Sequence, residues 1–208
     1  SPIAAPYNAA RYDYRAGLWG GTSPGFVWSQ EARAQNVEEL YVRAYYKWSS
    51  NFVGHANGAK IFLVGFGPNG NQFVLLMKGS QGVASRSFAL WPVFQSLGSL
   101  PTNVSQGGQC CLDPKNGNWA GVTPANIGRG VWVKVELRFS AGTHGQRDAS
   151  MRLWLNDRLV SHATGFDITK GSDVRFAVFK AAPVWGGGVS FFPAPQQLYL
   201  GELYVSGR

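Results

Sequence analysis

The stretch that decides the fold is residues 131–139, which read Val-Trp-Val-Lys-Val-Glu-Leu-Arg-Phe. The odd-numbered residues from Val131 to Phe139 are apolar, whereas Lys134, Glu136 and Arg138 between them are charged. An alternation with a period of two is typical of a β-strand with one buried and one wet face. The stretch therefore predicts an antiparallel sheet that covers a core on one side.

The same pattern extends outward in both directions from this strand. Residues 39–48 place Tyr41, Arg43, Tyr45 and Lys47 on one face and residues 42, 44, 46 and 48 on the other. Two turns carry the residue types that tolerate unusual backbone angles, at 68–71 and at 156–157. Further strands are predicted at 60–66, 72–78, 83–94, 150–155, 158–162, 174–180 and 198–205.

The expected fold class is all-β, a two-sheet antiparallel jelly-roll sandwich with few or no helices. Apolar residues at helical spacing do not persist anywhere in the chain, while short strands and turn signals recur along it. The 208 residues fit one domain, 1–208. Residues 1–36 read as a leading strand and loop that could act as an arm, and residues 95–130 read as loop.

Composition narrows the classes of protein. Charged residues make up 14% and aromatic residues 14%, which excludes a disordered tail and a coiled coil. No apolar run reaches the roughly 18 residues of a membrane span. The net charge is +8, from 19 Lys and Arg against 11 Asp and Glu, which favours a polyanionic partner. Because the cations are spread singly, a nucleic-acid-binding arm is not expected.

Cysteine and histidine give no sign of a cofactor or metal site. Cys110 and Cys111 are adjacent, so they do not form a disulfide framework. His55, His144 and His162 lie far apart and lack the spacing of metal ligands, so no metal and no cofactor is predicted. Asn103 begins a glycosylation acceptor pattern, which occurs often by chance.

Several motifs in order resemble those of bacterial jelly-roll proteins related to polysaccharide lyases. The matching segments are 41–47 followed by Asn51-Phe52, then 55–66, 132–136, 152–157, 185–188 and 204–208. The resemblance covers roughly residues 38–208 and implies a concanavalin-like lectin/glucanase fold with one concave sheet. Three sequence marks of the alginate-lyase branch, "RSELR", "QIH" and "YFKAGVYNQ", do not appear in this chain.

A concave sheet would turn Arg43, Tyr45 and Lys47 into a basic, aromatic-lined groove. Arginine binds carboxylates through parallel hydrogen bonds, and aromatic faces stack on sugar rings. Lys60 and Gln72 from the hairpin at 60–78 could join this groove, and Trp185 could close one end. The alternative is that this side of the strand at 39–48 faces solvent on a convex sheet, or that Tyr41 and Tyr45 are partly in the core. Trp132 and Trp154 are expected to pack in the core.

Three functions stay open. The first is extracellular binding of an acidic polysaccharide. The second is a polysaccharide lyase that cleaves a uronate polymer by β-elimination, with Tyr45 or His55 as acid or base and Arg43, Lys60 or Gln72 neutralising the carboxylate. The third is a self-assembling structural subunit of an extracellular or virion assembly. Hydrolysis is disfavoured, because Glu136 lies between Lys134 and Arg138 and is expected to be ion-paired.

Overall fold

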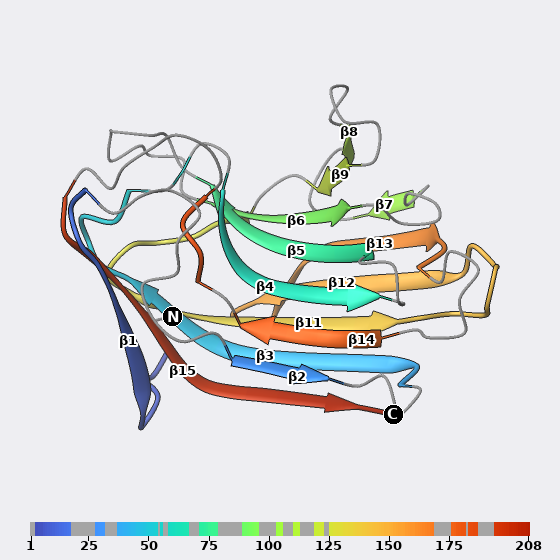
Figure 1. Ribbon diagram of the computed structural model, residues 1–208, viewed down its shortest axis with the longest axis horizontal. Coiled ribbons are helices and arrows are strands. Elements are labelled where there is room, and N and C mark those ends of the chain that lie inside the picture. Colours follow the sequence, from blue (N-terminus) through green and yellow to red (C-terminus); the bar gives the residue numbers. More distant parts are fainter. Residues whose placement is uncertain are drawn as a thin grey trace.

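The computed structural model is an all-β antiparallel sandwich (Figure 1). It describes residues 3–17, 28–31, 37–53, 55, 58–66, 71–78, 89–95, 103–105, 110–112, 119–122, 125–168, 176–181, 183–186 and 194–208. Its strands are β1 (Ala9–Tyr14), β2 (Trp28–Glu31), β3 (Glu39–Trp48), β4 (Ala59–Phe66), β5 (Asn71–Lys78), β6 (Ala89–Gln95), β7 (Asn103–Ser105), β8 (Cys110–Leu112), β9 (Trp119–Val122), β10 (Ala125–Asn126), β11 (Trp132–Ser140), β12 (Ala149–Leu155), β13 (Arg158–Phe166), β14 (Phe176–Ala181) and β15 (Gln196–Gly207).

The strands form two sheets, whose strands overlie one another in Figure 1. Sheet A has the order β1-β15-β3-β11-β12-β13-β7. Sheet B has the order β2-β14-β4-β5-β6-β9-β8, with β10 paired to β6. Every described pairing is antiparallel, and β3 lies inside sheet A between β15 and β11. Strands distant in sequence therefore become neighbours around residue 43.

The core lies between the sheets because their inward faces are apolar and aromatic. Along β3, buried residues alternate with half-buried ones, and Val42, Ala44 and Trp48 are fully buried. Aromatic contacts join the two sheets: the rings of Tyr46 and Phe62 are 5.4 Å apart, and those of Phe73 and Phe139 are 4.8 Å apart. Such edge-to-face pairs add to the free energy gained by burying the rings.

The strand predictions are confirmed where the alternation is clean. The strand at 39–48 has the predicted bounds, and the strand at 131–139 begins one residue later, at Trp132. Val131 was expected on the apolar face, but it precedes the strand and is 49% exposed. The region 95–130, predicted as loop, contributes the short strands β7, β8, β9 and β10. Their shortness explains why no periodic pattern is visible there.

The segments that carried minor predictions fall on short strands or outside the described residues. Cys110 and Cys111 lie in β8, where their backbones pair with Val122 and Gly121. Asn103 begins β7 at the edge of sheet A. The turn predicted at 68–71 lies outside the described residues except for Asn71. Within the described part of the chain, no helix is long and apolar enough to span a membrane.

Candidate functional site

The outer side of sheet A, which points away from the core, gathers charged and aromatic side chains from neighbouring strands. The alternation of β3, β11 and β12 places every second residue on this side, and these residues are half-buried. We call this surface the outer face. Its charged and aromatic members on the five central strands are Glu39, Tyr41, Arg43, Tyr45, Lys47, Trp132, Lys134, Glu136, Arg138, Arg152, Trp154, His162, Tyr199 and Tyr204.

The stripe predicted on β3 forms the middle of the outer face. Tyr41, Arg43, Tyr45 and Lys47 share one side of the strand, as the alternation predicts, and each is half-buried. Residues two apart on a strand lie roughly 6.6 Å apart, so Arg43 and Lys47 are separated by about 13 Å along the sheet. The stripe can therefore contact an extended ligand at more than one point.

Lys47 lies between two aromatic rings. Its Nζ is 6.0 Å from the centre of the Trp132 ring and 5.8 Å from that of Tyr199, because Trp132 and Tyr199 flank Lys47 on the neighbouring strands. Cation–π contacts of this kind hold an ammonium group without a carboxylate. The Lys47 ammonium group therefore has an aromatic ring on either side.

Arg43 is held by a ring from β15. Its guanidinium carbon lies 5.5 Å from the centre of the Tyr204 ring. A β-bulge brings this ring into place: the register between β15 and β3 shifts by one residue between Gly201 and Tyr204, and Glu202 has a positive φ of 47°. Because one extra residue reverses the side on which later residues point, Tyr204 faces outward and Leu203 packs toward the core.

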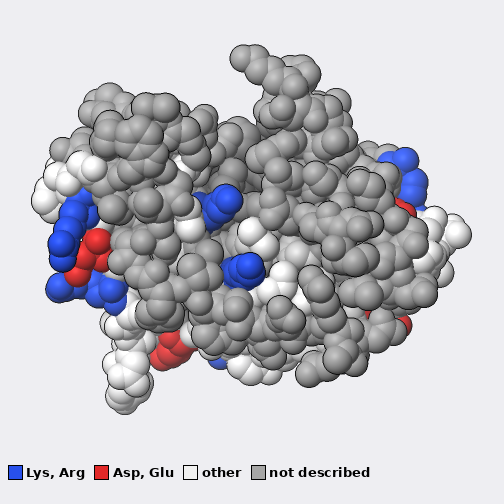
Figure 2. All heavy atoms as spheres, in the orientation of Figure 1, with Lys and Arg blue, Asp and Glu red and all other residues white. Residues whose placement is uncertain are grey.

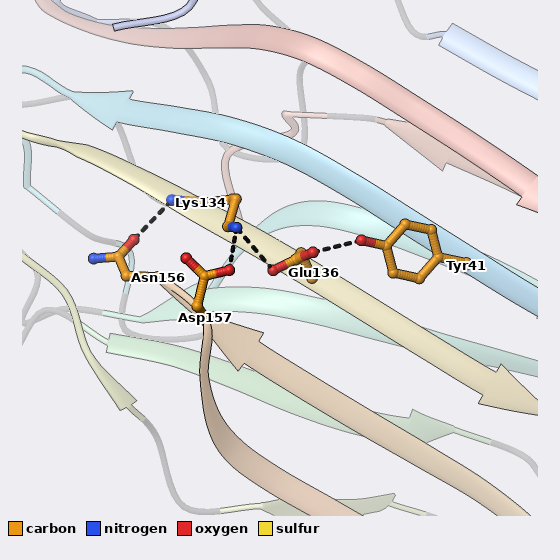
Figure 3. A network of polar contacts seen from close by, with 5 residues as sticks. All are labelled: Tyr41, Lys134, Glu136, Asn156 and Asp157. Carbon is orange, nitrogen blue, oxygen red and sulfur yellow. Dashed lines mark hydrogen bonds and ion pairs between the residues drawn. The ribbon is translucent and has the colours of Figure 1, made fainter. Parts of the chain in front are cut away.

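A network of polar contacts occupies the part of the outer face beside Arg43 (Figure 3). The Tyr41 hydroxyl donates to Glu136 Oε1 at 2.5 Å, and Lys134 Nζ lies 3.4 Å from Glu136 Oε2. Lys134 also forms an ion pair with Asp157. The ion pairing predicted for Glu136 is confirmed by these contacts.

The hairpin turn between β12 and β13 brings Asp157 to this network. Asn156 and Asp157 have φ values of 51° and 67°, which fits a two-residue hairpin turn. The backbone N–H of Asn156 donates to the Lys134 carbonyl, and the Lys134 N–H donates to Asn156 Oδ1, both at 2.9 Å. The turn predicted at 156–157 is thus confirmed, and it is fixed against Lys134.

Protonation of the network follows from its contacts. Burial, followed by the hydrogen bond to Glu136, raises the pKa of Tyr41 to about 12, so its hydroxyl is a donor at neutral pH. The hydrogen bond to Asp157 is the largest cause of a raised pKa at Lys134. Lys134 is therefore charged, and its charge is shared between two carboxylates.

A second carboxylate, Glu39, is neutralised at the end of β3. Arg138 Nη2 donates to both oxygens of Glu39 at 2.9 and 3.0 Å, and Arg208 Nε donates to Oε2 at 2.9 Å. The hydrogen bond from Arg208 is the largest cause that lowers the pKa of Glu39. A shallow surface pocket of about 140 Å³ opens beside these groups, lined also by Tyr41, Ser206 and Gly207.

Arg152 and His162 continue the outer face toward β13. They are directly opposite each other in the register of β12 and β13, and Arg152 is opposite Arg138 on β11. Burial, with a smaller contribution from the charge of Arg152, lowers the pKa of His162. His162 is therefore neutral at neutral pH, and Arg152 carries the charge of this pair.

The structure separates the other predicted site residues from the stripe. Lys60 and Gln72 lie on β4 and β5, which belong to sheet B, so the predicted neighbouring hairpin is not a neighbour of β3. His55 is 2% exposed and Trp185 is wholly buried, with their ring centres 5.3 Å apart. Burial lowers the pKa of His55. These two rings pack inside the sandwich instead of lining the outer face.

Several residues of the outer face were not predicted as site residues. Trp132 and Trp154 were expected in the core, but both are half-buried on the outer face. Their position could have been read from the alternation, since Trp154 lies between the buried Leu153 and Leu155, and Trp132 directly precedes the buried Val133. Tyr199 and Tyr204 also contribute rings, and the parity change between Leu200 and Leu203 was the sequence signal for the bulge.

On the side seen in Figure 2, the described Lys and Arg side chains are scattered, and those at the edge stand beside acidic ones. Among the described residues, no three His, Cys, Asp or Glu side chains gather closely enough to hold a metal ion. The outer face of sheet A is therefore the best-defined candidate site.

Comparison with known proteins places the fold. No protein-family model and no curated protein matches the sequence. Solved structures do match. An alginate lyase from a Chlorella virus is 14% identical, with a TM-score of 0.64, over 100% of this chain and 90% of that one. The marine PL-14 alginate lyase from Aplysia kurodai is 14% identical, with a TM-score of 0.67, over 96% and 83%.

A third match is the endo-beta-1,4-glucuronan lyase from the fungus Trichoderma reesei. It is 13% identical, with a TM-score of 0.53, over 99% of this chain and 76% of that one. The predicted resemblance to jelly-roll proteins of the polysaccharide-lyase group is confirmed at the level of the fold. At these identities the likeness concerns the fold, and function depends on the site itself.

Proposed function

We propose that this protein binds a uronate-containing polysaccharide along the outer face and cleaves it by β-elimination. The observation that carries this proposal concerns the polar contacts of the Arg43 side chain. In the part of the chain that the structure describes, Arg43 has no carboxylate partner, and its buried Nε has no hydrogen-bond acceptor. A half-buried guanidinium of this kind is suited to a carboxylate supplied by a ligand.

The surroundings of Arg43 favour an anionic sugar polymer. The two carboxylates of the outer face near it, Glu39 and Glu136, are each bound by cations of the protein. Lys47 offers a second cation about 13 Å away along the strand. Rings of Trp132, Tyr199 and Tyr204 lie beside these cations and can stack on the apolar faces of sugar rings.

The same residues contain the groups that β-elimination requires. A base removes the proton on the carbon next to the uronate carboxylate, the glycosidic oxygen leaves with a proton from an acid, and a carbon–carbon double bond forms. Arg43 would neutralise the carboxylate, on which negative charge develops. Tyr45 lies two residues further along the same face. Its side-chain oxygen would accept the proton from this carbon and pass it to the leaving glycosidic oxygen. His55 is buried in the core and has no part in this proposal.

The structural comparisons are consistent with this chemistry. The matching structures include lyases of alginate and of glucuronan, which are both uronate polymers. Because such polymers occur outside cells, we further propose that this protein acts extracellularly. Fractionation of the source cells would test the location directly, and recovery of the protein only from the cytosol would contradict it.

Binding is tested first, with fluorescently labelled alginate and glucuronan oligosaccharides. Arg43→Ala should weaken binding roughly tenfold to a hundredfold, because a charge-assisted hydrogen bond contributes about 1.5–3 kcal/mol. Lys60→Ala removes an equal charge from sheet B and is the matched control, which should bind like the wild type. Equal losses in both variants would point to general charge attraction and contradict the site.

Cleavage is then measured by the ultraviolet absorbance of unsaturated uronates. Tyr45→Phe should lower kcat by about 100-fold or more, the size expected for loss of a general acid or base. Tyr46→Phe is the control, since Tyr46 is the next residue but points into the core. If the wild type binds the oligosaccharides but releases no unsaturated product, cleavage is rejected and the protein is a binding module.

A further inference from the structure

Arg43 and Glu136 are directly opposite in the register of β3 and β11, but they do not form an ion pair. Opposite charges at such positions usually attract each other across the strands. Here both oxygens of Glu136 are engaged elsewhere, Oε1 by the Tyr41 hydroxyl and Oε2 by Lys134. The guanidinium of Arg43 instead lies over the Tyr204 ring.

The position of Lys134, one of the two residues that contact Glu136, is fixed by hydrogen bonds of its backbone. Figure 3 shows Tyr41 and Lys134 approaching the carboxylate from its two ends, with Asp157 on the far side of Lys134. The Asn156–Asp157 turn is fixed to the Lys134 backbone by two hydrogen bonds. The side chains of Lys134 and Glu136 are only 15% and 16% exposed, so water screens their attraction weakly.

We propose that Lys134 and Tyr41 are positioning residues, which hold the Glu136 carboxylate away from Arg43 and so keep the Arg43 guanidinium available for a uronate carboxylate. This inference rests on the proposed function. When either contact is lost, a Glu136 oxygen is released and can turn to its cross-strand neighbour Arg43. A ligand carboxylate would then have to displace Glu136, and binding would weaken.

The test is a set of variants measured with labelled glucuronan and alginate oligosaccharides. Lys134→Met should raise Kd about tenfold, and Tyr41→Phe, which leaves net charge unchanged, should raise it several-fold. Glu136→Gln removes the competing carboxylate and should bind at least as tightly as the wild type. The decisive variant is Lys134→Met/Glu136→Gln, in which binding should return to within about threefold of the wild type.

A charge-matched control separates positioning from the overall electric field. Lys134→Met/Asp157→Asn has the same net charge as the rescuing double variant but leaves Glu136 in place, so it should bind as weakly as Lys134→Met alone. Equal rescue by both double variants would overturn the proposal. So would wild-type affinity in Lys134→Met, or a failure of Glu136→Gln to rescue it.

A second measurement needs no sugar. Phenylglyoxal modifies arginine side chains, and an ion-paired guanidinium reacts more slowly than one without a carboxylate partner. Mass spectrometry should show slower modification of Arg43 in Lys134→Met and recovery of the wild-type rate in Lys134→Met/Glu136→Gln. If this pattern appears but no uronate binds the wild type, the positioning of Arg43 stands and the proposed ligand is wrong. Unchanged rates in all variants would overturn the positioning itself.

Discussion

The two sides of sheet A are made by the same strands, but they differ in what holds them. On the core side of β3, Val42, Ala44, Tyr46 and Trp48 are at most 1% exposed and pack against apolar residues. On the outer face, the residues between them are half-buried and interact through charges, hydroxyl groups and rings. Along β3, residues that stabilise the fold thus alternate with residues of the candidate site.

This difference has a practical consequence for mutagenesis. Substitutions on the core side should lower the free energy of unfolding and leave the affinity of the folded molecules for a ligand unchanged. Substitutions on the outer face should mainly lower the affinity for the ligand, because these half-buried side chains bury less apolar area on folding than the core side chains do. The following predictions test this separation.

The largest effect is expected for Trp185→Ala, in the core onto which sheet A packs. Trp185 is wholly buried against Phe52 and His55, so its removal leaves a cavity and should cost about 3–5 kcal/mol of unfolding free energy. Urea unfolding followed by circular dichroism measures this loss. Oligosaccharide affinity, corrected for the folded fraction, should not change. A selective loss of affinity with unchanged stability would place Trp185 in the ligand site.

A smaller effect, of opposite kind, is expected for Tyr204→Ala on the outer face. Loss of the cation–π contact to Arg43 should weaken oligosaccharide binding about two- to fivefold, corresponding to roughly 0.5–1 kcal/mol. Because Tyr204 is 48% exposed, the midpoint of urea unfolding should hardly move. Tyr204→Phe keeps the ring and should bind like the wild type. Equal weakening in both variants would contradict the role of the ring.

The smallest effect is expected for Glu39→Gln, at the end of the outer face. Arg208 and Arg138 lower the pKa of Glu39 in the folded protein, so the ionised carboxylate stabilises the fold above the ordinary pKa of glutamate. The wild type should therefore be slightly more stable than Glu39→Gln at neutral pH, by about 0.5 kcal/mol or less. This difference should vanish as the pH falls through the lowered pKa. A difference that grows in acid would contradict the assignment.

The central strands could be predicted because their alternation is a local property. Within β3 and β11, outward and inward residues alternate without a break, and no long-range information is needed to assign the faces. The short strands β7 to β10 contain two to four residues and carry no period, so their existence depends on the strands beside them. Val131 fits the alternation but falls just before β11, because an alternating pattern does not mark where a strand ends.

The candidate site was predicted only in part. Arg43, Tyr45 and Lys47 could be grouped because they share one strand. Lys60 and Gln72 were grouped with them wrongly in space, since the sequence does not tell which sheet a hairpin joins. The role of Arg43 as a binding residue stays a prediction. Its neighbours Tyr204 and Glu136 come from strands distant in sequence, and a bulge sets the side on which Tyr204 points.

The amino-acid sequence by itself determined that the chain forms antiparallel strands, and which residues of β3 and β11 face the core. Period-two alternation and turn residues act over a few positions, so they can be read from the chain directly. Apart from hairpins such as β12–β13, only the tertiary structure decided which strands lie side by side. In that arrangement Lys134 and Tyr41 contact Glu136, and Arg43 lies beside Tyr204. Contacts across strands depend on register and sheet order, which the local sequence does not encode.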